Sequence, residues 1–112
     1  MIKNTSKNKV LSSKARYVKS LFSKALGLMF KDKVDYGLVF NFYIENNKHH
    51  LHTYFMKFNI DVLFLDSNNK VIKIYKNVKP WRSDIYGEGK HIIELQAGKS
   101  FNTQMGDKIS FK

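Results

Sequence analysis

The feature that most constrains the fold is a succession of short segments rich in apolar, β-branched and aromatic residues. Turn-forming residues separate these segments at intervals of about 8–12 residues, which is typical of a β sandwich or barrel. Residues 61–66 are apolar on both faces, as in a central strand. The pattern predicts a mostly β domain of the α+β class, with a small antiparallel barrel-like or sandwich architecture. The expected strands include residues 37–42, 51–58, 61–66, 71–75 and 91–95.

One segment departs from this pattern and predicts a short helix near the N-terminus. Leu21, Ala25 and Leu28 recur at helical spacing within residues 20–29. Ser20 precedes them and suits the N-cap, because its hydroxyl can accept a hydrogen bond from an orphan amide of the first turn. We therefore expect one helix of about two to three turns.

The length of 112 residues suits one compact domain. We expect a flexible basic arm at residues 1–8 and a single β-rich domain at residues 9–112. Cysteine is absent, which excludes disulfides, thiolate catalysis and thiolate metal sites. No apolar run approaches the roughly 18–20 residues that cross a bilayer. The polar, basic N-terminus does not resemble a secretory signal, so we expect a cytoplasmic protein without a transmembrane segment.

The formal charge of +11 is concentrated in the first third of the chain. Residues 1–33 carry nine basic side chains and one acid, Asp32. Such asymmetry is typical of surfaces that contact nucleic acid or anionic membranes, although a solvated lysine-rich face is the favoured explanation. The scarcity of arginine weakens the case for phosphate recognition. The candidates for a polyanion contact are Lys14, Arg16, Lys19 and Lys24.

A series of motifs spread along the chain carries a resemblance to a known family. The motifs include Gly37-Leu38-Val39-Phe40, His52-Thr53-Tyr54-Phe55-Met56, residues 58–66, Lys79-Pro80-Trp81-Arg82 and Gly106-Asp107-Lys108. In this order they resemble the uncharacterised domain-of-unknown-function family 192, also called uncharacterised protein family 0127, in its archaeal form. The resemblance covers about residues 9–112. It implies a small barrel-like β domain with one helix, and it implies no activity.

Five residues within the matched motifs are candidates for a ligand-binding cleft: His52, Met56, Asp61, Trp81 and Arg82. Trp81 would supply an apolar wall and Arg82 an anion contact. His52 and Asp61 would be polar anchors above an adaptable floor formed by Met56.

Four of these five candidates also have a structural interpretation. His52 can be a half-buried histidine bonded to a loop, and Asp61 can be satisfied by loop amides. Trp81 can fill the end of the barrel while Arg82 pairs with Asp84.

Catalytic chemistry has little support in this sequence. It contains no Gly-x-Ser-x-Gly motif. An extended strand would direct His49 away from His50 and His52, which argues against a zinc site. We predict no catalytic residue, no cofactor and no metal, and a hydrolase using His52 and Asp61 is the least favoured alternative. The preferred interpretation is a binding or accessory module for an unknown small molecule or protein, with polyanion binding as the second hypothesis.

Overall fold

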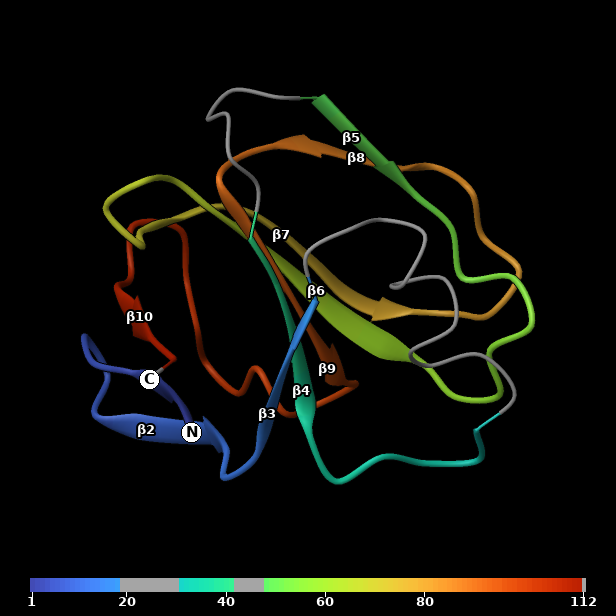
Figure 1. Ribbon diagram of the computed structural model, residues 1–112, viewed down its shortest axis with the longest axis horizontal. Coiled ribbons are helices and arrows are strands. Elements are labelled where there is room, and N and C mark those ends of the chain that lie inside the picture. Colours follow the sequence, from blue (N-terminus) through green and yellow to red (C-terminus); the bar gives the residue numbers. More distant parts are fainter. Residues whose placement is uncertain (19–30, 42–47, 112) are drawn as a thin grey trace.

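The computed structural model describes residues 1–18, 31–41 and 48–111, in which ten strands form three sheets (Figure 1). The central sheet has five strands, and their spatial order is β3–β4–β9–β6–β7. Its β3 and β4 are parallel, and its other neighbouring strands are antiparallel. The bounds are β3 (Ala15–Val18), β4 (Gly37–Asn41), β9 (His91–Gln96), β6 (Ile60–Leu65) and β7 (Val71–Val78).

The strand β6 is buried along its whole length, which confirms the prediction of a central strand. It pairs with β9 on one side and with β7 on the other. The hairpin to β7 forms because the Asp66 carboxylate accepts hydrogen bonds from the backbone N–H groups of Asn68 and Lys70. Asn69 takes a left-handed φ of 64° in this turn, a conformation that asparagine tolerates well.

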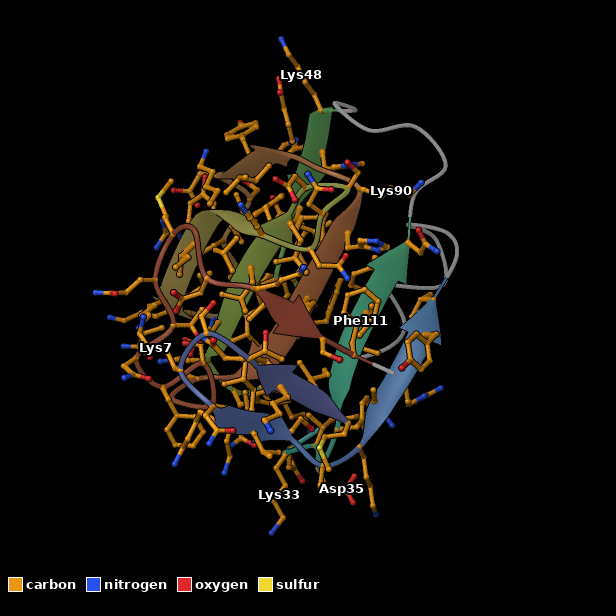
Figure 2. All side chains as sticks on the ribbon, turned by 90° about the vertical axis from the view of Figure 1, so that its left-hand side faces the viewer. Lys7, Lys33, Asp35, Lys48, Lys90 and Phe111 are labelled. Carbon is orange, nitrogen blue, oxygen red and sulfur yellow. The ribbon has the colours of Figure 1, made fainter. Side chains whose placement is uncertain are left out.

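A second sheet joins the two ends of the described chain. Its order is β10 (Ile109–Ser110), β1 (Ile2–Asn4) and β2 (Lys9–Ser12), and Figure 2 looks onto it. Ile2 and Asn4 are fully buried, so residues 2–4 are an integral central strand. The expectation of a flexible arm at residues 1–8 is therefore corrected. A third sheet pairs β5 (Lys48–Leu51) with β8 (Ile85–Glu88).

The smaller sheets cover opposite faces of the central sheet, so the described strands form layers. Side chains alternate along each central strand, and this alternation creates two cores. Leu51 and Ile85, from β5 and β8, pack against one face in a cluster that contains Phe64. Ile2 and Ile109, from β1 and β10, pack in the other cluster.

Two parts of the predicted fold class need correction, although its mostly β character is confirmed. The described residues contain strands and no helix, so the α+β assignment is wrong for this part of the chain. Strands cover both faces of the central sheet there, which buries its apolar side chains without a helix. The predicted helix at residues 20–29 lies outside the described residues. Among the described strands, β3 and β7 are sheet edges that do not pair with each other, so the barrel is not closed.

Within the described ranges, no helix has the length and apolar character needed to span a membrane.

Candidate functional site

The candidate site is built where the loop after β5 meets the loop after β7, and Thr53 joins the two. Its side chain is buried, and its hydroxyl donates to the Lys79 carbonyl at 2.8 Å. The same hydroxyl accepts a hydrogen bond from the Arg82 amide at 2.9 Å. The Thr53 backbone also donates to the Arg82 carbonyl and accepts from the Trp81 amide. One threonine therefore fixes the position of residues 79–82.

Three exposed aromatic side chains gather at this junction, and we call them the aromatic patch: Tyr54, Phe55 and Trp81. Their side chains are 37%, 45% and 60% exposed. The Trp81 ring lies 4.8 Å from the Phe55 ring and 5.8 Å from the Tyr54 ring, between centroids. His52 stacks on Tyr54 at 4.7 Å, so it extends the same surface.

The backbone of the patch adopts a conformation that is rare for large side chains. Phe55 has a φ of 63° and Trp81 a φ of 66°, both in the left-handed region. Bulky residues rarely adopt such angles, and strained residues of this kind cluster at functional sites. The strain is therefore concentrated at two of the three residues that form the aromatic patch.

Arg82 stands next to the patch but is already paired. Its Nε and one Nη atom donate to the two carboxylate oxygens of Asp84 at 2.7 and 2.5 Å. This hydrogen bonding raises the pKa of Arg82 and lowers the pKa of Asp84. The interpretation that pairs Arg82 with Asp84 is confirmed, whereas the burial of Trp81 as a plug is wrong because most of its side chain is exposed.

Asp61 lies in the interior, away from the patch. Its Oδ1 accepts from the Asn77 amide, and its Oδ2 accepts from the amides of Gly98 and Ser100 and from the Ser100 hydroxyl. The interpretation of a carboxylate satisfied by loop amides is confirmed. Met56 is also buried, within a core cluster. The structure thus brings His52, Trp81 and Arg82 together and leaves Met56 and Asp61 in structural positions.

Sequence reasoning missed Tyr54 and Phe55 as surface residues. The alternation over residues 51–58 predicts a strand, which would place neighbouring side chains on opposite faces. The strand β5 ends instead at Leu51, and both side chains are exposed in the loop that follows. The motif match at His52-Thr53-Tyr54-Phe55-Met56 was the available signal.

The remaining histidines of the cluster contact backbone carbonyls. His49 is buried, and its Nε2 lies 3.0 Å from the Gly89 carbonyl oxygen. His50 is exposed, contacts the Ser83 carbonyl and stacks on Tyr86 at 4.4 Å. Neighbouring residues on β5 thus face opposite sides, as strand geometry requires.

The candidates for polyanion contact are engaged within the protein where the structure describes them. Lys14 Nζ lies 2.8 Å from the Asp35 carboxylate, and this pairing raises the pKa of Lys14 and lowers that of Asp35. Arg16 lies over the Tyr36 ring at 5.0 Å and donates to its hydroxyl. Lys19 and Lys24 lie outside the described residues. The observed contacts therefore do not favour this surface over the aromatic patch.

The fold and the site together define a small layered β domain with an exposed aromatic surface. The chain belongs to the DUF192 family, described as "Uncharacterized ACR, COG1430", whose model matches residues 2–111. The resemblance drawn from the motifs is therefore confirmed, and the match extends into β1. The family description assigns no activity.

Archaeal relatives are similar over nearly the whole chain. The UPF0127 protein of Pyrococcus horikoshii is 41% identical over 99% of this chain and 98% of its own length. The UPF0127 protein of Thermococcus sibiricus is 34% identical and is matched over 75% of its length by the whole of this chain.

Two solved structures share the fold. A Sinorhizobium meliloti 1021 protein, described as a candidate transcription regulator, aligns with a TM-score of 0.77 at 21% identity. The alignment covers 86% of this chain and 79% of that one. A Novosphingobium aromaticivorans protein of unknown function has a TM-score of 0.75 at 18% identity, with coverages of 87% and 74%. At these identities the likeness concerns the fold alone.

Proposed function

We propose that this chain is a binding module that presents the aromatic patch to a partner polypeptide. The observation that carries this proposal is the contact of the exposed Trp81 ring with two further exposed rings, Tyr54 and Phe55. Exposed aromatic side chains that gather in one place mark interaction sites, whereas scattered ones need no explanation.

The fixed geometry of the patch supports a binding role. Thr53 holds the Trp81 loop through main-chain and side-chain hydrogen bonds, and the Trp81 ring contacts both other rings before any partner arrives. Ordering surface side chains on association reduces affinity by about 0.5–1.5 kcal/mol for each flexible side chain. A patch whose rings are already fixed avoids much of this loss.

The composition of the surface favours a polypeptide. Tryptophan, tyrosine and arginine are the residues that most often dominate the energy of protein interfaces, and polar residues usually surround them. Here the exposed Lys57 and Lys79 and the Arg82–Asp84 pair lie next to the patch in sequence. Because the chain carries a formal charge of +11, we expect the partner segment to be acidic with an apolar anchor.

The proposal can be tested with peptides selected from a displayed random library against the purified protein. Trp81 is the only tryptophan in the chain, so its fluorescence emission reports directly on the patch. We expect selected peptides to shift or quench this emission in a saturable manner. Selection of no peptide, or binding without any change in Trp81 emission, contradicts the proposal.

Matched variants locate the binding site. Trp81→Gly and Phe55→Gly remove the rings while glycine adopts the left-handed φ without strain, so the loops should stay folded. Loss of a central aromatic anchor should weaken a labelled peptide by about thirty-fold, as at a typical hot spot. The control Met105→Ala removes an equally exposed apolar side chain outside the patch and should leave affinity unchanged. Equal weakening by the control would refute the assignment.

A further inference from the structure

A cleft of about 460 Å³ lies at another place on the molecule, where the turn after β2 faces the end of β9. We call it the β2–β9 cleft. Asp35, one of its lining residues, lies at the end of the molecule where β4 begins (Figure 2). No residue of the aromatic patch lines this cleft. Its walls include Val10, Ser13, Tyr36, Gln96, Lys99 and Phe101.

Phe101 forms the most unusual wall of the cleft. It is 42% exposed and has a left-handed φ of 50°. The Lys9 ammonium lies 4.4 Å from the centroid of its ring, and the Lys76 ammonium donates to its carbonyl at 2.8 Å. Residues in strained backbone conformations of this kind cluster at functional sites.

The turn that carries Phe101 is anchored from inside the protein. The buried Asp61 carboxylate accepts hydrogen bonds from Gly98 and from both the amide and the hydroxyl of Ser100. The Phe101 amide in turn donates to the Gly98 carbonyl at 3.2 Å. Asp61 is therefore a positioning residue, which fixes the wall of the cleft from β6 without facing it.

The charges around the cleft are mostly positive. Lys99 is one of its lining residues, and Lys9 sits over the Phe101 ring. Asp35 is the acidic residue among its lining, and Lys14 pairs with it at 2.8 Å. The charges of Lys14 and Asp35 cancel each other. Lys9 and Lys99 therefore leave an excess of positive charge beside two aromatic rings, Tyr36 and Phe101.

We propose that the β2–β9 cleft binds a small organic anion that carries a planar ring, of the class of a nucleoside monophosphate. The volume lies within the range of about 300–1,000 Å³ that is usual for small-molecule sites. A planar base stacks on an aromatic wall, and a phosphate is attracted to ammonium groups, here Lys9 and Lys99, that form no ion pair with an acid in the described ranges. The ligand class follows from the two features together. The ammonium groups alone would also suit a bare phosphate, and the aromatic wall alone would also suit a neutral nucleoside.

The test is a titration of adenosine 5′-monophosphate into isotope-labelled protein, followed by the amide resonances of residues 98–101. We expect saturable shifts at these residues, much weaker binding of adenosine, and no localised shifts with inorganic phosphate. Absence of saturable shifts with the nucleotide overturns the proposal. Localised binding of phosphate that equals the nucleotide also overturns it, because the ring would then contribute nothing.

Variants separate specific binding from general charge attraction. Phe101→Gly removes the ring and relieves its left-handed φ, so the turn should stay folded. Lys99→Gln removes one charge from the cleft. Each should weaken nucleotide binding by about fivefold or more, whereas the exposed Lys70→Gln on the distant hairpin should change it less than about twofold. Equal effects of Lys70→Gln and Lys99→Gln would overturn the proposal.

The emission of Trp81 keeps this inference independent of the proposed function. Trp81 does not line the cleft, so nucleotide binding there should leave its fluorescence unchanged. Shifts at residues 98–101 without a change in emission support the cleft alone. A change in Trp81 emission without those shifts places the nucleotide at the aromatic patch and refutes the assignment to the cleft.

Discussion

At the scale of single residues, His91 combines burial with an unsatisfied polar atom. Its side chain is only 8% exposed and packs edge-on against Phe111 at 4.9 Å. Its Nδ1 has no hydrogen-bond partner among the described residues. Desolvation by burial, helped by Lys90, lowers the pKa of His91 despite an opposing hydrogen bond with the Phe40 backbone. The folded protein therefore favours the neutral imidazole.

We expect acidification to destabilise the protein through His91. Because its pKa is lower in the folded state, the unfolded state binds the proton first as the pH falls below 6.5. The contribution of neutral His91 to the free energy of unfolding is therefore complete above pH 6.5, and it is lost as the pH falls through the folded-state pKa. Thermal melting followed by circular dichroism should show a lower Tm at about pH 5.5 than at about pH 7.5.

Two variants isolate this contribution. His91→Leu replaces the imidazole with an apolar side chain of similar size and should flatten the fall in Tm over this interval. His50→Gln, at an exposed position of β5, should retain the wild-type slope. An unchanged slope in His91→Leu would show that other groups cause the pH dependence.

The predictions for single residues succeeded in two situations. Either the interaction partner is close in sequence, or any backbone amide nearby can serve as the partner. Arg82 pairs with Asp84, only two positions away, and Asp61 accepts from loop amides as a buried carboxylate must. The role of Thr53 could not be predicted, because its partners at Lys79 and Arg82 are brought near only by the tertiary fold.

At the scale of elements, the β5–β8 pair depends on a close approach to the central sheet. A side-chain carbon at Gly87 would lie 2.5 Å from the nearest ring carbon of Phe64. Phe64 is fully buried on β6, so its ring has little room to move. Glycine at this position therefore allows the third sheet to pack directly on the core.

We expect Gly87→Ala to lower the free energy of unfolding by about 1–3 kcal/mol, the usual effect of overpacking a core. Urea denaturation measures this change. In a Phe64→Leu background the added methyl group should be much less harmful, because the smaller side chain leaves room for it. Equal destabilisation in both backgrounds would argue against the Gly87–Phe64 contact as the cause.

Strands were predictable where their own residues form a dense apolar run or are followed by a clear turn sequence. Residues 61–66, 71–75 and 91–95 were predicted as strands and correspond to β6, β7 and β9, since dense apolar runs and a clear hairpin mark them. The strand β1 was missed because Ile2 is followed by a run of polar residues and is buried only by packing against residues far along the chain, such as Leu95. The strand β8 was missed because residues 82–90 are polar and contain glycine, as exposed loops do.

At the scale of the whole molecule, a buried polar network ties the first residues to the last ones. The Asn4 side-chain amide donates to the Thr103 hydroxyl and to the Asp107 carboxylate, both at 2.9 Å. The Asn4 Oδ1 accepts from the Lys7 amide, and the Lys7 ammonium lies 3.0 Å from Asp107. Asparagine at this position satisfies three groups at once.

We expect Asn4→Ala to lower the free energy of unfolding by about 1–3 kcal/mol, because buried partners lose their hydrogen bonds. Calorimetry of the full chain measures the effect. The exposed neighbour Thr5→Ala should change stability by less than about 0.5 kcal/mol, as is usual at the surface. Similar losses in both variants would contradict a special role for the network.

The position of β1 also decides how the molecule would respond to mechanical tension. Lys3 pairs with Ser110 and Asn4 with Ile109 in antiparallel register, so the chain leaves Ile2 and Ser110 at the same end of the pair. A force that pulls these two points apart acts across the strands and ruptures their hydrogen bonds one after another. Tension between these two points would therefore load the few β1–β10 hydrogen bonds one pair at a time, and the packing of Ile2 in the core beside Leu95 would resist the separation.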